Sequence, residues 1–196
     1  IYFMVRIDCP EIFYSVKFTY RYYPDSTMVE LIPEYLFTRD KIKEHRLAMK
    51  SRVKKLALLA EKLSEKEKEL FIHDFIVKNV KYDKLKKEYS HEIIGALGNG
   101  VAVCEGMAKA VKILCDELGI WCIVALSDAN PDKGIKYRHA WNVIRIDGKY
   151  YHLDVTFDNT LSRDDAVRYD YVNLADKQIF RDHEPVIWKV PECIDS

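Results

Sequence analysis

Two strand-like runs at residues 139–146 and 149–157 constrain the fold of this chain more than any other feature. Only Asp147 and Gly148 separate them. An Asp-Gly pair between two such runs favours a two-residue hairpin turn, because both turn positions need a positive φ that Asp and Gly tolerate. The sequence therefore predicts an antiparallel hairpin as part of a central sheet.

The tight turn also predicts which residues of the two strands share a face. The expected register pairs Trp141 with Asp154 and His139 with Thr156. Residues two apart on a strand share a face, so His139 and Asp154 become diagonal neighbours, about 7 Å apart at the backbone. A slip of one residue would place them on opposite faces. In the expected register, the Asp154 carboxylate can accept from one ring nitrogen of His139 and fix its tautomer.

Upstream, the segment GVAVCEG at residues 100–106 leads into a predicted helix that Gly119 ends. Cys104 lies at the first turn, where unpaired N–H groups and the positive end of the helix dipole favour a thiolate over a thiol. The glycines just before it are expected to let the backbone bend and to leave room for a substrate. Cys104 shares its inward face with a stripe at helical spacing: Met107, Ala108, Val111, Leu114, Cys115 and Leu118.

Cys104, His139 and Asp154 together suit acyl transfer by a sulfur nucleophile. Each residue alone has an ordinary explanation, namely a small buried hydrophobe, a half-buried histidine and a structural carboxylate. The coincidence of three independent placements favours the catalytic hypothesis. The backbone N–H of Cys104 is the expected oxyanion donor, whereas Asn99 is expected to be a turn residue.

Two alternatives stay open at this point. Cys104, His139, His152 and Asp154 have the residue types of a tetrahedral zinc site, although no two of them form a compact chelating pair. The chain could also be a non-catalytic module that holds a peptide in the same cleft. Cys115 and Cys122 are expected in the core, so neither alternative involves them.

Composition excludes several classes of protein. With 48% hydrophobic and 32% charged residues, the chain is typical of a globular domain. Its longest apolar run, residues 120–126, is far shorter than the roughly 20 residues of a membrane helix. The formal net charge of zero gives no support to a nucleic-acid partner, and the basic run at 78–87 is expected to be a solvated loop.

Cysteine usage and acidic patterns bound the chemistry further. Five scattered cysteines without a CxxC pair argue against a complete disulfide framework. No acidic loop has the pattern of a calcium site, and we expect no cofactor. The chain reads as one domain over residues 1–196, with residues 1–63 supporting a catalytic core at 64–196. Because it begins inside an ordered segment, we expect it to be a fragment of a longer protein.

The supporting half is predicted to contain a hairpin followed by two helices. Alternation at residues 12–22, a turn signal at 24–26 and a returning strand at 28–32 predict the hairpin. Asp40 is predicted to cap the first helix. Ser64 is predicted to open the second through a capping box with Glu67.

Side chains of the two helices are also assigned to faces. The first helix is expected to bury a stripe at helical spacing that consists of Ile42, Met49, Val53, Leu56, Ala57 and Ala60. The second is expected to bury Leu70, Phe71 and Phe75. His73 and Asp74 are adjacent, about 100° apart on a helix, so we expect them to be poor partners at its surface or end.

Four motifs together resemble one family of proteins. GVAVCEGMAKA at 100–110, LGI at 118–120, HAWN at 139–142 and DGKYYHLDVTFD at 147–158 resemble the transglutaminase-like superfamily, cysteine enzymes related in core architecture to papain-like proteases. The likeness to the core covers about residues 71–158. The segments at 8–13, 82–83, 169–173 and 182–183 look like those of bacterial, particularly clostridial, members. Phe157 stands where such proteins often have Trp, a departure that concerns packing rather than chemistry.

The resemblance implies a fold and a set of roles. It implies an α+β fold with a papain/transglutaminase-like core, in which the nucleophile helix packs on an antiparallel β-sheet, preceded by an N-terminal β-hairpin and helices. Cys104 is implied as the nucleophile, His139 as general base and acid, and Asp154 as the orienting carboxylate, in the papain-like order.

The implied reaction is attack on a peptide or protein amide through a thioester, without a cofactor. A peptidase or amidase is favoured over the alternative, a protein-glutamine transamidase (transglutaminase). The resemblance also favours a bacterial, extracellular or cell-surface location over a cytoplasmic one. It is compatible with further domains in a longer parent protein.

Overall fold

The computed structural model describes residues 2–162 and 166–194. Within these ranges, no helix is both long and apolar enough to cross a membrane. In chain order the elements are α1 (Tyr2–Asp8), η1 (Pro10–Ile12), β1 (Ser15–Tyr22), β2 (Val29–Tyr35), α2 (Arg39–Ala60), α3 (Glu65–Asn79), β3 (Lys81–Tyr82), η2 (Glu88–His91), η3 (Ile94–Asn99), β4 (Val101–Ala102), α4 (Cys104–Glu117), β5 (Cys122–Ser127), η4 (Pro131–Lys133), β6 (His139–Ile146), β7 (Lys149–Leu153), α5 (Val155–Leu161) and α6 (Asp176–Ile179).

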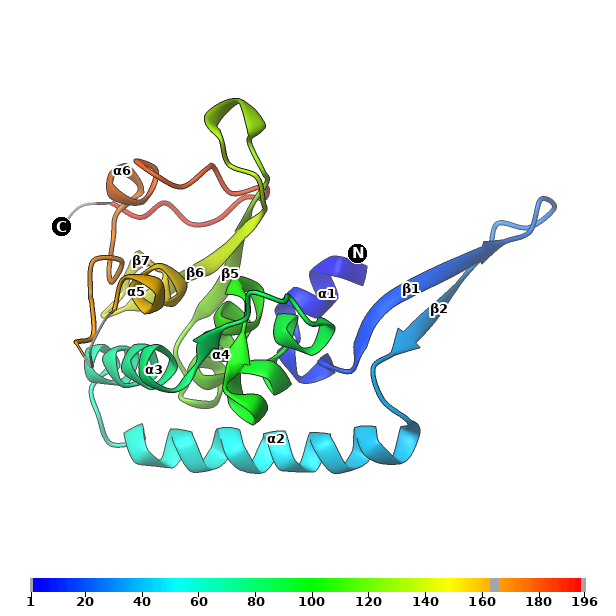
Figure 1. Cartoon of the computed structure of the whole chain (residues 1–196), viewed down its shortest axis with the longest axis horizontal. Helices are drawn as coiled ribbons and strands as arrows, with labels where there is room; N and C mark the ends of the chain where they lie inside the picture. Colours follow the sequence, from blue (N-terminus) through cyan, green and yellow to red (C-terminus); the bar gives the residue numbers. More distant parts are fainter. Residues whose placement is uncertain (1, 163–165, 195–196) are drawn as a thin grey trace.

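Helix α4 forms the centre of the molecule (Figure 1). It contacts β5 and β6 on one side, and α2 and α3 on the other. Its predicted apolar stripe is buried from Met107 to Cys115, whereas Leu118 is half-buried, and Gly119 follows the end of the helix with φ +72°. One hydrophobic cluster joins α2 to α4 through Met49, Val53, Leu56, Met107, Val111 and Leu114. The supporting helix and the central helix therefore share a core.

The expected antiparallel sheet is present and has three strands in the order β5-β6-β7. Asp147 and Gly148 form the turn, with φ values of 49° and 81°. The ladder pairs Ile146 with Lys149 at the turn and Asn142 with Leu153 at its far end. The predicted register is therefore correct as far as the two strands pair.

The predicted strand over residues 149–157 is too long. Strand β7 ends at Leu153, and helix α5 begins at Val155. Asp154 caps this helix, since its Oδ1 atom accepts from the N–H groups of Thr156 at 2.8 Å and Phe157 at 3.1 Å. The predicted pairs of Trp141 with Asp154 and of His139 with Thr156 are thus absent from the ladder.

The C-terminal segment covers both edges of the sheet. Leu174 bridges His152 on β7, and Val186 bridges Ser127 on β5. The N–H of Ile187 also donates to the Leu126 carbonyl at 2.9 Å. The chain between these bridges therefore runs from one edge of the sheet to the other, and the unpaired strand edges are protected.

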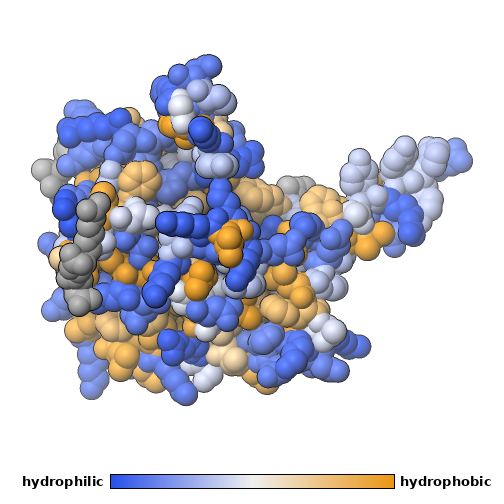
Figure 2. Space-filling model, viewed as in Figure 1, coloured by the Kyte–Doolittle hydropathy of each residue, from blue (hydrophilic) through white to orange (hydrophobic). Residues whose placement is uncertain are grey.

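The predicted N-terminal hairpin is present as β1 and β2, which pair antiparallel. It projects from the body as a narrow arm (Figures 1 and 2). Near its base, the rings of Phe18 and Tyr2 lie 4.4 Å apart. One face of the arm is apolar and consists of Phe18, Tyr20, Tyr22, Val29, Leu31 and Pro33.

The start of α2 differs from the prediction, whereas the start of α3 agrees with it. Thr38, not Asp40, occupies the N-cap of α2, and Asp40 lies in the first turn. The predicted capping box is present at α3: the Ser64 side chain accepts from the N–H of Glu67, and Glu67 accepts from the N–H of Ser64. The predicted stripe of α2 is buried from Met49 onward.

The buried face of α3 is displaced from the predicted one. Ile72, His73 and Ile76 are fully buried, whereas Phe71 and Phe75 are half-buried. The expectation that His73 lies at the surface is wrong, because α5 packs against α3 at this point. The ring nitrogens of His73 contact Asp74 Oδ1 at 3.2 Å and Asp158 Oδ2 at 3.1 Å, so the adjacent residues are partners after all.

Glycines before and within α4 allow a close approach of the backbone. A Cβ atom at Gly95 would lie 2.5 Å from the Tyr89 carbonyl oxygen, and one at Gly106 would lie 2.2 Å from the Ser90 carbonyl oxygen. The expected bend is present at Gly100, where φ is +64°. The space beside Gly95, however, is filled by backbone rather than left open to a substrate.

Gly106→Ala is expected to lower the free energy of unfolding by about 1–3 kcal/mol, because the added methyl group meets a backbone oxygen that cannot move alone. This loss should exceed the gain of about 1 kcal/mol that Ala brings to a helix interior. Urea denaturation measures it. The matched control is Gly98→Ala, whose methyl would meet only side-chain atoms of Ile94 and Met49, at 3.3 Å. A Gly106→Ala protein as stable as the control would contradict the close packing.

Candidate active site

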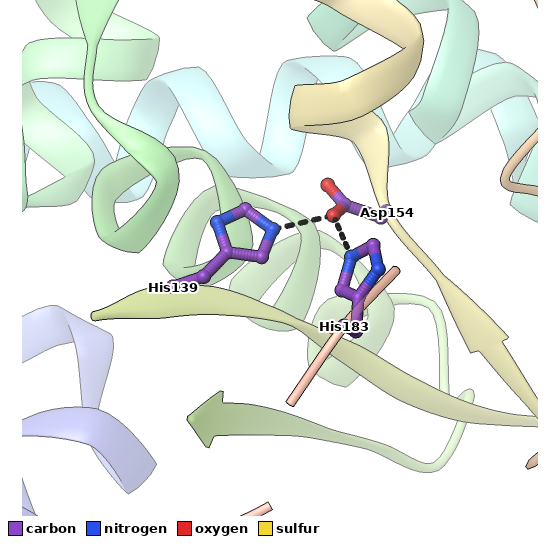
Figure 3. A group of neighbouring side chains, drawn as sticks. All are labelled: His139, Asp154 and His183. Atoms are coloured by element: carbon purple, nitrogen blue, oxygen red, sulfur yellow. Dashed lines mark hydrogen bonds and ion pairs between the residues drawn. The ribbon is translucent and has the colours of Figure 1, made fainter. Parts of the chain in front are cut away.

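The structure brings the three sequence-predicted site residues together. Cys104 is the first residue of α4, His139 is the first residue of β6, and Asp154 lies between β7 and α5. His139 Nε2 is 2.5 Å from Asp154 Oδ2 (Figure 3). Cys104 lies beside the His139 ring and contributes to the raised pKa of His139. Since Nε2 faces Asp154, Nδ1 is the nitrogen left for the thiol.

Packing between α4 and the sheet explains this meeting. Cys104 packs against a small apolar cluster that includes Ala108 of α4, Val124 and Leu126 of β5, and Ala140 of β6. His139 is adjacent to Ala140 and pairs with Ser127 across the sheet. The first turn of α4 and the first residue of β6 therefore lie against each other at one end of the core.

The carboxylate of Asp154 is fully buried and uses both of its oxygens. Oδ1 accepts the two N–H groups that begin α5. Oδ2 accepts from His139 at 2.5 Å and from His183 at 2.8 Å (Figure 3). A buried carboxylate is stable only when it is paired and hydrogen-bonded, and Asp154 meets this condition at each oxygen.

The pair of His139 and Asp154 is strongly coupled electrostatically. Burial alone would lower the pKa of His139, but the charge and hydrogen bond of Asp154, with a smaller contribution from Cys104, raise it to about 10. Burial alone would raise the pKa of Asp154, but the charge and hydrogen bond of His139, followed by those of His183, hold it well below its usual range. The pair is therefore an imidazolium and a carboxylate at neutral pH.

His183 is a site residue that the sequence reasoning did not select. Its ring is buried and lies 5.1 Å from the His139 ring and 4.5 Å from the Phe157 ring. It comes from the segment that crosses between the two sheet edges, 29 residues after Asp154. The only available signal was the segment at 182–183 among those that look like bacterial family members.

Trp141 packs against the His139 ring and is itself held by a chain of hydrogen bonds. The two rings are stacked, with centroids 5.7 Å apart. Trp141 Nε1 donates to His152 Nδ1 at 2.9 Å, and His152 Nε2 faces Asp176 Oδ1 at 2.9 Å. Because Nδ1 accepts, the neutral His152 ring carries its proton on Nε2 and donates it to Asp176. Burial lowers the pKa of His152 and thus favours this neutral form.

In the described part of the chain, the four residues of the zinc alternative do not form one cluster. His152 lies with Asp176 and Cys193, whereas His139 and Asp154 lie with His183. The proton on His152 Nε2 occupies the position that a metal would need. In the second cluster the possible ligand atoms lie within 4.8 Å of one another, but both histidines already donate to one oxygen of Asp154. A metal there would have to displace both protons.

A buried network of charges fixes the first turn of α4. Glu105, the residue after Cys104, pairs with Lys109 at 2.7 Å and with His91 at 3.1 Å. Lys109 also pairs with Glu92 at 2.9 Å, and Glu92 with Arg6 of α1. Burial would raise the pKa of Glu105, but the His91 hydrogen bond and the Lys109 charge lower it to about 2.

Asn142, Asn99 and Phe157 were also noted in the sequence, and the structure places each of them. Asn142 of the HAWN motif donates to the carbonyls of Ala108 at 3.0 Å and Ile123 at 3.3 Å, and so joins α4 to β5. Asn99 is the last residue of η3 and is exposed. Phe157 packs against the His139 ring at 5.0 Å.

Asp154→Asn is expected to lower the free energy of unfolding by about 3 kcal/mol at pH 5.5, because the buried ion pair loses one partner. The contribution of His139 is complete below its ordinary pKa of 6.5 and is lost as the pH rises through about 10. The contribution of Asp154 is complete above its ordinary pKa of 3.8 and is lost as the pH falls toward its lowered value. The stability difference from the native chain should therefore be largest between about pH 4 and 6.5 and should shrink toward pH 10.

Urea denaturation of both proteins at pH 5.5, 8 and 10 measures this difference. Asp128→Asn is the control, since the ion pair of Asp128 with Arg138 is exposed on both sides. It should change stability by less than about 0.5 kcal/mol. A difference for Asp154→Asn that stays constant from pH 5.5 to 10 would show that the ion pair is not the source of its stability.

Comparison with known proteins places the chain in a family. A family model described as the transglutaminase-like superfamily matches residues 54–155. The crystal structure of a TGase superimposes with a TM-score of 0.50 at 14% identity, over 79% of this chain and 47% of the other. No curated protein sequence matches significantly.

Two further solved structures are similar to a lesser degree. A candidate cysteine protease from Cytophaga hutchinsonii has 26% identity and a TM-score of 0.42, over 53% of this chain and 37% of the other. A candidate protease from Parabacteroides distasonis has 17% identity and a TM-score of 0.39, over 70% and 35%. This chain spans less than half the length of each of the three proteins. Because the family model covers more than half of the chain, the protein belongs to the transglutaminase-like superfamily, and its α+β fold is the fold of that family.

Proposed function

We propose that this protein is a cysteine-dependent acyl-transfer enzyme that attacks an amide through Cys104, and that it acts as a peptidase or amidase. One observation carries the proposal: Cys104 stands at the first turn of the central helix, beside an imidazole that Asp154 keeps protonated at neutral pH. A neighbouring positive charge and a helix N-terminus both favour the thiolate. Cys104, His139 and Asp154 are the proposed catalytic residues.

The chemistry follows from these positions. The Cys104 thiolate attacks the carbonyl carbon of the amide, and the developing oxyanion faces the N–H groups at the start of α4. His139 then gives its proton to the leaving amine as the C–N bond breaks, which leaves a thioester on Cys104. Water attacks the thioester while His139 takes one of its protons, and the acid departs as the thiolate is restored.

Exposure at the site supports water as the acceptor. Cys104 and His139 are partly exposed, whereas Asp154 is buried. Solvent can therefore reach the thioester without access to the carboxylate that orients the base. Transfer to a second amine, as in a transamidase, differs only in the group that attacks the thioester and is the alternative activity. The third reading is a module that binds a peptide without turning it over.

The rate of iodoacetamide labelling against pH tests the thiolate. We expect Cys104 to be labelled selectively at pH 6, at least about tenfold faster than in His139→Ala, because the mutation removes the imidazolium. Mass spectrometry identifies the labelled cysteine. Cys115, Cys122 and Cys193 are buried and should stay unlabelled. Cys9 is partly exposed, so the experiment uses a Cys9→Ser background. An ordinary thiol profile that His139→Ala does not change would leave only the binding module.

A turnover assay distinguishes the two enzyme activities. Peptide amides are incubated with the protein in the presence of a primary amine, and products are measured by mass spectrometry. We expect the free acid to dominate, and Cys104→Ala to reduce its formation by about 1,000-fold or more. Amine-linked product in excess of the acid would favour the transamidase. No product of either kind, with a reactive Cys104, would mean that the amide class tested is not the substrate.

A further inference from the structure

We propose that His183 is a positioning residue of the active site. Its ring donates a second hydrogen bond to Asp154 Oδ2, the oxygen that also accepts from His139. This second bond weakens the one from His139 and so limits how tightly His139 holds its proton. The inference rests on the proposed function of Cys104, His139 and Asp154. Within the described residues, the His183 ring hydrogen-bonds Asp154 and Asp182 rather than Cys104 or His139, and it acts through Asp154.

The geometry of His183 points to this role. Its Nε2 atom lies 2.8 Å from Asp154 Oδ2, the same oxygen that His139 Nε2 approaches at 2.5 Å (Figure 3). The two imidazoles therefore enter from different elements and meet at a single acceptor. An oxygen that accepts two charge-assisted hydrogen bonds is a weaker acceptor for each of them than an oxygen that accepts only one.

The His183 ring cannot turn away from this oxygen. Its Nδ1 atom lies 2.6 Å from Asp182 Oδ1, and the Tyr171 hydroxyl donates to the other oxygen of Asp182. The ring also packs against Trp141 and Phe157, with centroid distances of 5.0 Å and 4.5 Å. Both nitrogens are thus held and aromatic rings pack against the imidazole, although His183 is not needed to cap α5 or to complete the sheet.

Titratable groups face His139 and His183 from several elements. Cys104 comes from α4, Asp154 from the start of α5, and His152 from β7, where its neutral ring bonds Trp141 and Asp176. Asp182 and Tyr171 come from the C-terminal segment. Among the residues that the structure describes, Asp154 alone accepts hydrogen bonds from both His139 and His183, so the hydrogen-bonded connection between the two rings passes through it.

A second hydrogen bond on Asp154 Oδ2 suits His139, because this residue must act as base and acid in turn. A general acid works best when its pKa is close to the working pH. Pairing with a buried carboxylate raises the pKa of His139 far above that range. A second donor on the same oxygen works against this rise. Removing His183 should therefore make His139 a stronger base and a poorer acid.

The test compares His183→Phe, which keeps an aromatic ring without donors, with His183→Gln, which keeps an amide N–H that can reach Asp154. The probe is iodoacetate, an anion whose reaction with Cys104 falls when the neighbouring imidazolium loses its proton. The pH range over which labelling falls is the alkaline limb of the profile. We expect His183→Phe to move this limb upward by about half a pH unit or more. Turnover of a peptide amide at pH 7 should fall by about tenfold in kcat, with KM unchanged.

His183→Gln should change both quantities in the same directions but less, and it carries the test if His183→Phe does not fold. His45→Phe is the matched control, because His45 lies on α2 and its ring contacts Phe37 rather than the site. This control should change neither quantity. A merely structural role would lower labelling and turnover together and would not move the limb upward.

The outcomes separate the two proposals. A limb that stays in place or moves downward in folded His183→Phe and His183→Gln, while the native chain shows the limb, overturns the role of His183 alone. A native chain whose Cys104 labels as an ordinary thiol overturns the proposed function, and the role of His183 falls with it.

Discussion

The buried carboxylate of Asp154 is the interaction on which the site and its surroundings depend. Four hydrogen bonds converge on it: two from backbone N–H groups that begin α5 and two from imidazoles. Such a charge is costly to bury unless its oxygens are fully used. The same contacts that satisfy Asp154 therefore end β7, begin α5 and fix the ring of His139. Fold and chemistry share one requirement here, because neither the cap nor the base tolerates a displaced carboxylate.

Helix α4 supplies the other half of the site by a different principle. Its apolar stripe joins the sheet to α2 and α3, so its axis is fixed by the core. Its first turn, where Cys104 lies, is fixed by the buried charges of Glu105 and Lys109 and by the close approach of the Ser90 backbone to Gly106. The nucleophile thus stands on a rigid element whose position depends on packing from both sides. The proposed base stands on a strand that packs against the same helix.

The differences between the sequence predictions and the structure have local causes. The run at 149–157 alternates and is rich in aromatic and β-branched residues, which predicts one strand, but Asp154 is also a strong N-cap residue. In the folded chain Asp154 caps a helix, so the strand ends at Leu153 and helix α5 begins at Val155. His73 was expected at the surface because adjacent helix residues diverge, yet burial against α5 gave it Asp158 as a second partner. The same helix periodicity that located α3 was too coarse to identify its buried face.

The sequence by itself determined the hairpin at Asp147 and Gly148 and the helix behind Cys104, because short-range turn chemistry and residue periodicity encode them. The motifs also pointed to Cys104, His139 and Asp154 as one site, but packing of α4 on the sheet is what brings the three residues together. Only the tertiary structure decided that His183 joins Asp154 and that His152 supports Trp141 rather than a metal. These contacts depend on how the C-terminal segment crosses the sheet from β7 to β5. The path of a segment over a surface is set by the sum of distant packing and pairing interactions, and no local pattern in the sequence records it.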